Sequence, residues 1–341
     1  MTTFQEDTLL KQLSDSSEAT QLDLSNLRIL NATTEGLSEI FSSIRHYNLA
    51  STIFTLDLSQ NNLQNLPEDI FQGLENLHSL NLSENNFDNK NTIHLSEYLE
   101  ESNIISIDLS DNNLSATGAV ALLMHTKIES LDLSGNSIGD KGLIGISYVL
   151  RNNKALRILK LNHTDIAYTG ISALADTLKN QNTLESLELG DNQDIGSDGI
   201  AMLCDALAVN TSLSSLNLFA TELTDNEAFM LGKIFHQNSA LTSLNLSSNQ
   251  ISYNGTTALL EGLSNNRHLT TLTLTNNHLS KKSPLFIEID KMLTLNKLCI
   301  EKKNEQLLTR YYRQLQSSTL RERNCEALIL QMAHIKTKKK S

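Results

Sequence analysis

The stretches "IISIDLSDNNL" (Ile104–Leu114) and "IESLDLSGNSI" (Ile128–Ile138) decide the fold of this chain, because they repeat one phrase after 24 residues. In this phrase, LxxLxLxxNxL, the alternating leucines point to one side of a short strand and the residues between them point to the other. One such strand cannot bury its leucines alone. Stacked copies share a parallel sheet and a continuous core, so the phrase predicts a repeat protein.

The phrase recurs along most of the chain, at spacings of 24 to 34 residues. Clear copies begin at Ile53, Leu77, Ile104, Ile128, Leu156, Leu184, Leu213, Leu241 and Leu269, and weaker copies begin at Ala19 and Leu295. About eleven units therefore cover residues 19–303. Apolar residues at helical spacing follow a recurring glycine and predict a helix in most units. Asp198, Asn254 and Thr169 precede such glycines, and we expect them to assist the helix starts.

These phrases, at about 28 residues a unit, resemble the leucine-rich-repeat family in its ribonuclease-inhibitor class. The resemblance implies an α/β solenoid, a horseshoe with a parallel β-sheet on its concave face and mainly helices on its convex face. The unit from Ile53 contains Pro67 and resembles the shorter typical class, whose outer side is less helical. The asparagine of the phrase is expected to bond the buried turn, and Thr164 and Thr221 replace it with fewer bonds.

The ends of such a stack expose core and must be covered. Residues 1–18 suit an N-terminal helical cap, residues 304–335 suit a helical C-terminal cap, and residues 336–341 form a basic tail that we expect to be disordered. The formal charge is asymmetric: residues 281–341 carry +8, whereas residues 1–280 carry −20. An acidic body attracts basic protein partners and repels nucleic acid and anionic lipid.

Other sequence signals set the compartment and the class of function. The chain contains three distant cysteines, no long apolar run and no export signal, which favours a cytosolic protein, which we expect to be monomeric, with no integral membrane association. It contains no HExxH, GxxxxGK[ST] or GxSxG motif, and its "DxSxN" runs lack the spacing of an EF-hand loop. We therefore expect no catalytic residues, no cofactor, no metal and no enzymatic activity.

The concave face is the remaining candidate site, since the residues between the leucines point there. Large apolar side chains stand at some of these positions, and carboxylates stand at others. The residues predicted to contact a partner are Phe54, Asp57, Ile105, Asp108, Asp111, Glu129, Asp132, Ile158, Lys160, Glu188 and Phe219.

One unit, "LRILKLNHT" (Leu156–Thr164), is basic where its neighbours are acidic. Aligning the units places Arg157 between Glu129 and Glu185, and Lys160 between Asp132 and Glu188. His163 falls near Asp191 in the same alignment. We therefore predict a charge ladder across three units, with each exposed pair worth at most about 1 kcal/mol.

The predicted function is a non-catalytic protein–protein interaction module that binds a partner with a basic patch. The mixed repeats, the Asn/Ser/Lys-rich composition and the charged C-terminal stretch resemble secreted bacterial effectors of the Legionella type. That resemblance implies secretion without an N-terminal signal peptide, in the manner of type IV secretion, into a host cell and action on a host protein. Two alternatives remain: a GTPase-activating protein resembling that of Ran, whose family ends in an acidic tail unlike this basic one, and a stand-alone adaptor or scaffold.

Overall fold

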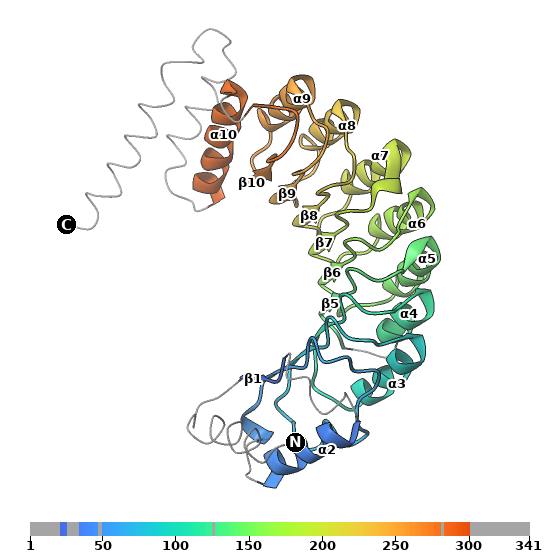
Figure 1. Cartoon of the computed structure of the whole chain (residues 1–341). Coiled ribbons are helices and arrows are strands. Elements are labelled where there is room, and N and C mark those ends of the chain that lie inside the picture. Colours follow the sequence, from blue (N-terminus) through green and yellow to red (C-terminus); the bar gives the residue numbers. More distant parts are fainter. Residues whose placement is uncertain (1–20, 26–33, 47–49, 125–126, 281–282, 301–341) are drawn as a thin grey trace, which may run out of the picture.

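The computed structural model describes residues 21–25, 34–46, 50–124, 127–280 and 283–300. In these residues, ten parallel strands form one open sheet in chain order along the inner side of an arc, and helices line the outside (Figure 1). This confirms the predicted α/β solenoid. The strands are β1 (Gln21–Asp23), β2 (Thr55–Asp57), β3 (Ser79–Asn81), β4 (Ser106–Asp108), β5 (Ser130–Asp132), β6 (Ile158–Lys160), β7 (Ser186–Glu188), β8 (Ser215–Asn217), β9 (Ser243–Asn245) and β10 (Thr271–Thr273).

Each repeat unit is here called a rib. The outer side of most ribs is helical. The helices are α2 (Thr34–His46), α3 (Asn89–Glu100), α4 (Ala116–Met124), α5 (Gly139–Leu150), α6 (Tyr168–Leu178), α7 (Gly196–Leu207), α8 (Asp225–Ile234), α9 (Tyr253–Leu263) and α10 (Pro284–Ile300), with 3₁₀ turns η2 (Ala50–Thr52) and η3 (Gln193–Ile195). Residues 58–78, all described, contain turns and no helix. The less helical outer side predicted for the rib with Pro67 is therefore confirmed.

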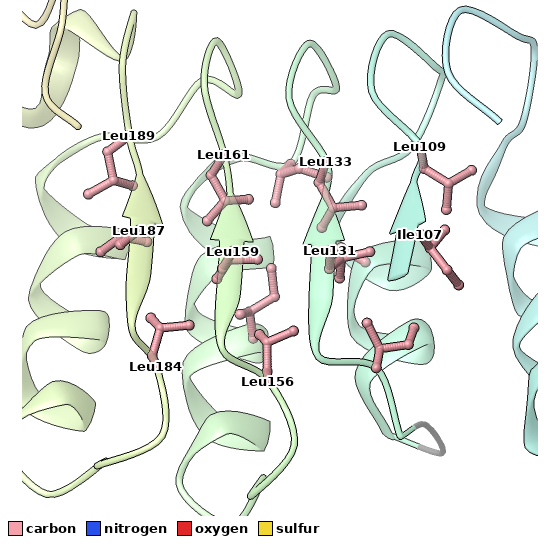
Figure 2. Close-up of a cluster of buried hydrophobic side chains, with 14 of the residues drawn as sticks. Ile107, Leu109, Leu131, Leu133, Leu156, Leu159, Leu161, Leu184, Leu187 and Leu189 are labelled. Atoms are coloured by element: carbon pink, nitrogen blue, oxygen red, sulfur yellow. The ribbon is translucent and has the colours of Figure 1, made fainter. Parts of the chain in front are cut away.

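The core consists of leucine rows that run across the ribs. The strands pair in register, so that Leu131 lies beside Leu159, and Leu159 lies beside Leu187. Leu133 and Leu161 belong to the next row, and all these side chains have no exposed surface (Figure 2). Because side chains alternate along a strand, burial of these rows directs the residues between them to the concave face.

The recurring asparagine of the phrase bonds the buried turn, as predicted, and it also links neighbouring ribs. Asn85 donates from Nδ2 to the carbonyls of Leu58 and Leu82 at 3.0 Å, and its Oδ1 accepts the N–H groups of Asn61 and Leu63. A threonine hydroxyl has a single hydrogen, and that of Thr164 donates to the carbonyl of its own rib's Leu161 at 2.8 Å.

The turns of the two ribs with threonine differ from those of most ribs with asparagine. Asp165 and Glu222, which follow Thr164 and Thr221, adopt positive φ angles of 57° and 59°. Among the described ribs with asparagine, Asn62 alone shows the same feature at that position.

The recurring glycine has a cause that the sequence did not reveal. Asp140, on α5, accepts at Oδ1 the N–H groups of Ala167 and Gly170 at 2.9 Å and so caps α6 of the next rib. A Cβ atom at Gly170 would lie 2.7 Å from that Oδ1. Asn89 and Asp225 act in the same way on the ribs that follow them. The predictions for Thr169 and Asn254 were therefore wrong, because Asp140 caps α6, and Ser252 and Asp225 hold the start of α9. Asp198 lies in the first turn of α7, where a negative charge favours the helix start, as predicted.

The last weak copy of the phrase does not supply an eleventh strand. Leu295 lies inside helix α10 with its side chain buried, because its leucine spacing also satisfies a helical period. The predicted caps at residues 1–18 and 304–335 and the tail at 336–341 lie outside the described residues. Across the described part of the chain, no helix has both the length and the apolar character that crossing a membrane requires.

Candidate protein-binding face

The central column of the concave face consists of the residue between the two leucines of each LxL. Strand register places these residues side by side, in the order Asp23, Asp57, Asn81, Asp108, Asp132, Lys160, Glu188, Asn217, Asn245 and Thr273. The predicted contact residues Asp57, Asp108 and Asp132 thus belong to one acidic stretch, which is interrupted by Asn81. The amide of Asn81 donates to Asp57 Oδ2 at 3.1 Å.

Each aspartate of this stretch also holds the turn that follows its strand. Asp57 Oδ1 and Asp132 Oδ1 accept the N–H group two residues ahead, at 2.9 and 3.0 Å. Asp108 Oδ1 accepts both the N–H and the hydroxyl of Ser110, at 2.9 and 2.6 Å. One carboxylate oxygen is therefore committed to the turn, and the second oxygen is left to act toward a neighbour or a partner.

Crowding of negative charge is visible at Asp108. Burial raises the pKa of this carboxyl, and the nearby Asp132 raises it further, against the hydrogen bonds from Ser110 and the charge of Lys160. Burial lowers the pKa of Lys160, but the hydrogen bond and charge of Asp132 and the charges of Glu188 and Asp108 outweigh it, so the pKa is raised. Lys160 therefore remains a cation inside an acidic surface.

The predicted charge ladder is present. Arg157 Nη1 lies 2.5 Å from Glu185 Oε1, and its Nε lies 3.8 Å from Glu129 Oε2. Lys160 Nζ lies 3.0 Å from Asp132 Oδ2. His163 Nδ1 lies 3.0 Å from Asp191 Oδ2.

Two more of the predicted carboxylates border the ladder. Glu188 occupies the register position beside Lys160, as expected, and its Oε2 accepts the amide of Asn162 at 2.7 Å. Asp111 lies exposed on the turn after β4 and adopts a positive φ of 53°.

The predicted apolar contact residues fall into separate places. Phe54 is 43% exposed and its ring stacks on that of His78, with centroids 5.8 Å apart, while Ile105 occupies the same column on the next rib. We call Phe54, His78 and Ile105 the apolar edge. Residue-by-residue inspection missed His78, although the aligned repeats place it between the other two.

Ile158 and Phe219 do not form one patch, because β7 lies between their strands. Ile158 is 37% exposed and is the apolar member of a column otherwise made of serine, threonine and Gln21. Phe219 is half-buried, with its ring over Gly190, where a Cβ atom would overlap it. The predicted contact residue Phe219 is therefore only partly exposed, because its ring packs over the small Gly190.

The described residues were also compared with the requirements of a metal site and of a reactive cysteine. They contain no group of three or more His, Cys, Asp or Glu side chains arranged to hold a metal ion. The thiol of Cys204 is buried, and burial followed by the charge of Asp205 raises its pKa to about 12. This cysteine is therefore a protonated core residue at neutral pH.

Comparison with known families identifies the repeats. Residues 178–327 match the TMOD/LMOD leucine-rich domain. Residues 51–98 match one leucine-rich-repeat model, and residues 102–123, 125–147 and 152–175 match another.

Similar proteins share the repeats over a small part of their own length. The chain is 27% identical over 197 residues to the Rho GTPase-activating protein gacW of Dictyostelium discoideum, covering 52% of this chain and 17% of that protein. It is 33% identical over 105 residues to the NACHT, LRR and PYD domains-containing protein 13 of Homo sapiens, covering 30% of this chain and 10% of that protein.

Solved structures similar to this chain include "Leiomodin-1 Actin-Binding Site 2 (ABS2)", with a TM-score of 0.43, 15% identity and coverage of 50% of this chain and 96% of the other. The leucine-rich repeat domain of APL1B has a TM-score of 0.41 and 19% identity, covering 80% of this chain and 69% of the other. The chain is a leucine-rich repeat protein, and such domains are generally protein-interaction modules without catalytic activity.

Proposed function

We propose that this chain is a non-catalytic protein-interaction module whose concave face binds a protein with a basic patch. The observation that carries the proposal is the acidic stretch of the central column. The turn bond made by Asp108 or Asp132 requires only an acceptor oxygen, and the neutral Asn81 makes it equally well, to Ser83 N–H at 3.0 Å. The negative charges are thus additional to what the fold requires, and a cationic partner surface complements them.

The apolar edge supports the same proposal. Buried aromatic anchors supply much of the free energy of protein interfaces. Phe54 and His78 present one stacked aromatic surface beside the acidic stretch, and Ile105 extends it by one rib. We infer that this edge provides the apolar part of the contact.

The helix-backed ribs of about 28 residues also lead us to assign the chain to the ribonuclease-inhibitor class.

Charge reversal at matched positions tests the concave site. Asp108→Lys combined with Asp132→Lys is compared with Asn217→Lys combined with Asn245→Lys, which lie in the same column on other ribs. Proteins captured from a eukaryotic lysate by the unaltered chain are identified, and their binding to both variants is then measured. We expect the first variant to lose a partner that the second retains. If the partner binds both variants as well as the unaltered chain, the acidic stretch is not the docking site.

We also propose, from the resemblance described above, that the chain acts as a bacterial effector in the cytosol of a host cell. A reporter enzyme fused to the chain and followed from a bacterial donor into host cells tests delivery. Capture from host and bacterial lysates in parallel tests the setting, because an effector selects a partner from the host lysate alone. A partner found only in the bacterial lysate contradicts this proposal and leaves the concave site untouched.

A GTPase-activating function is the alternative that the Rho GTPase-activating relative favours, although this chain spans only 17% of that protein. GTP hydrolysis by Ran and by Rho-family GTPases, with and without the chain, separates the alternatives. Actin is a second candidate partner, because residues 178–327 match the TMOD/LMOD leucine-rich domain and the leiomodin-1 structure is named as an actin-binding site. Co-sedimentation with filamentous actin tests it.

A stand-alone adaptor instead binds two partners at once, which a ternary pull-down detects.

A further inference from the structure

A groove of about 560 Å³ lies between the turns of the rib that lacks a helix and the C-terminal end of α3. Its floor includes Leu74, Leu77 and Ile104, which belong to the buried core. Leu77 and Ile104 directly precede His78 and Ile105 in the chain, so the groove meets the apolar edge of the concave face. It lies outside the acidic central column.

The groove exists because one rib departs from the others. Helices α3 to α10 each pack against the next helix in the stack, whereas the turns after Pro67 stand on the other side of α3. Turns cover less of the neighbouring helix than a helix does. Phe71 on the turn side and Tyr98 on α3 therefore remain half-buried and line the walls.

The rim of the groove is acidic on both sides. Glu68 and Glu75 lie on the turn side, Glu97 lies on α3, and Glu101 is the residue that caps the C-terminal end of α3, all of them exposed. In the part of the chain that the structure describes, the ion pair found for these four glutamates is Glu97 with His94 at 3.5 Å. The nearby guanidinium of Arg45 is bound to Asp69 at 2.6 Å. Among the described residues, three of the four carboxylates thus make no ion pair.

The phenol of Tyr98 lies within this acidic field. Burial raises its pKa, and the charges of Glu68 and Glu97 raise it further, so the hydroxyl stays protonated at neutral pH. A ring flanked by carboxylates can stack under a guanidinium while the carboxylates bond its N–H groups. This arrangement favours arginine or lysine side chains over neutral or acidic ones.

We propose that this groove is a second docking site, which takes an amphipathic segment of a partner protein bearing arginine or lysine. Its apolar side packs on Phe71 and Tyr98 where the missing helix leaves them uncovered, and its basic residues pair with the four glutamates. The site goes beyond the proposed concave-face function, and it allows the chain to hold a partner on two adjoining surfaces.

Peptide display tests the groove while the partner protein is still unidentified. The probe is a phage-displayed library of 12-residue random peptides, selected on the full chain and counter-selected on the variant Glu97→Lys with Glu101→Lys. Selected peptides are synthesised and their affinities measured by fluorescence anisotropy. A control variant, Asp205→Lys with Glu261→Lys, makes the same charge change at exposed positions of α7 and α9.

We expect the selection to yield peptides with apolar residues and at least two basic residues, weakened about tenfold or more by the groove variant and about twofold or less by the control. Gln72→Trp, which fills the groove without a charge change, is expected to weaken them too. Absence of peptides that distinguish the two variants, equal losses in the control, or selection of acidic peptides overturns the proposal. Asp108→Lys with Asp132→Lys leaves this binding intact, which separates its outcome from that of the concave site.

Discussion

The concave sheet has two regions with one backbone and different charge. On β2 to β7 the central column carries three aspartates, Asn81, Lys160 and Glu188, whereas on β8 to β10 it carries Asn217, Asn245 and Thr273. Asp132 Oδ1 accepts the N–H of Ser134 at 3.0 Å, and Asn245 Oδ1 accepts the N–H of Ser247 at 3.0 Å. A charged and a neutral acceptor thus make the same turn bond at this position, and the rib of Lys160 forms without that bond, so the charge is left available for recognition.

The largest expected effect concerns what the two regions share. Leu131 in the acidic region and Leu216 in the neutral region are both buried in the leucine rows, at 0% and 1% exposure. We expect Leu131→Ala and Leu216→Ala each to lower the free energy of unfolding by about 2–5 kcal/mol, because each leaves a cavity in a continuous core. Urea unfolding followed by circular dichroism measures both. A cost below about 1 kcal/mol at either site would show that this leucine does not belong to a continuous packed core.

A smaller effect on the free energy of unfolding is expected at Glu227 of α8, on the helical side of the neutral region. This side chain is 4% exposed, and it accepts the N–H and hydroxyl of Thr224 at 2.8 and 2.7 Å and the hydroxyl of Ser197. We expect Glu227→Ala to lower the free energy of unfolding by about 1–3 kcal/mol at pH 7, since it removes the carboxylate of the α8 capping box and its charge-assisted hydrogen bonds from Thr224 and Ser197. Exposed Glu261, changed to alanine, is the control.

The pH dependence of Glu227 sharpens this prediction. Burial raises its pKa, but the hydrogen bonds from Ser197 and Thr224 outweigh burial and hold the pKa below its ordinary value of 4.5. Its contribution is therefore complete above pH 4.5 and is lost as the pH falls through the lower pKa of the folded state. The deficit of Glu227→Ala should shrink in acid. A deficit that stays constant down to acid unfolding would contradict a role for the carboxylate.

The sequence predicted the strands and the charge ladder for a single reason. Repeat alignment and strand register coincide in a solenoid, so that placing Arg157 between Glu129 and Glu185 on paper also places it there in space. The same alignment failed at Leu295, whose leucine spacing suits a helix as well as a strand. Features that repeat in one column from rib to rib could therefore be predicted from the sequence.

Contacts between side chains of different columns could not be predicted from the sequence. The cap from Asp140 to α6 spans two ribs, and the recurring glycine showed only its consequence, the need for space. The seat of Phe219 on Gly190 had a signal, since the two residues are neighbours in one column. The groove had none, because its walls come from the turns after Pro67 and from α3, and their separation depends on how the two ribs pack.

The ladder distinguishes the regions by their response to salt. Arg157 and Glu185 are each about half exposed, at 51% of their side chains. A double-mutant cycle with Arg157→Ala and Glu185→Ala should give a coupling free energy of at most about 1 kcal/mol, which decreases as salt is added. In the same column of the neutral region, a cycle with Ser214→Ala and Thr242→Ala should show no salt dependence. An equal salt response in both cycles would contradict the ladder as a local ion pair.

The smallest expected effect tests the comparison itself. Asp108→Asn keeps an oxygen that can accept from Ser110, as Asn245 does from the N–H and hydroxyl of Ser247 at 3.0 and 2.7 Å. We expect stability at pH 7 to change by about 0.5 kcal/mol or less, in the stabilising direction. Burial and then Asp132 raise the pKa of Asp108 above its ordinary value of 3.8. The folded chain thus binds this proton more tightly than the unfolded chain.

It follows that the unaltered chain loses part of its stability as the pH rises from 3.8 through the raised pKa, whereas Asp108→Asn does not. The two proteins should have equal stability below pH 3.8 and diverge above it, as thermal unfolding across that range can measure. Asn245→Asp is the converse control, with neutral Asn217 and Thr273 beside it, and it should diverge less. If Asp108→Asn instead destabilises the chain by more than about 1 kcal/mol at pH 7, the charge belongs to the fold and its assignment to a partner fails.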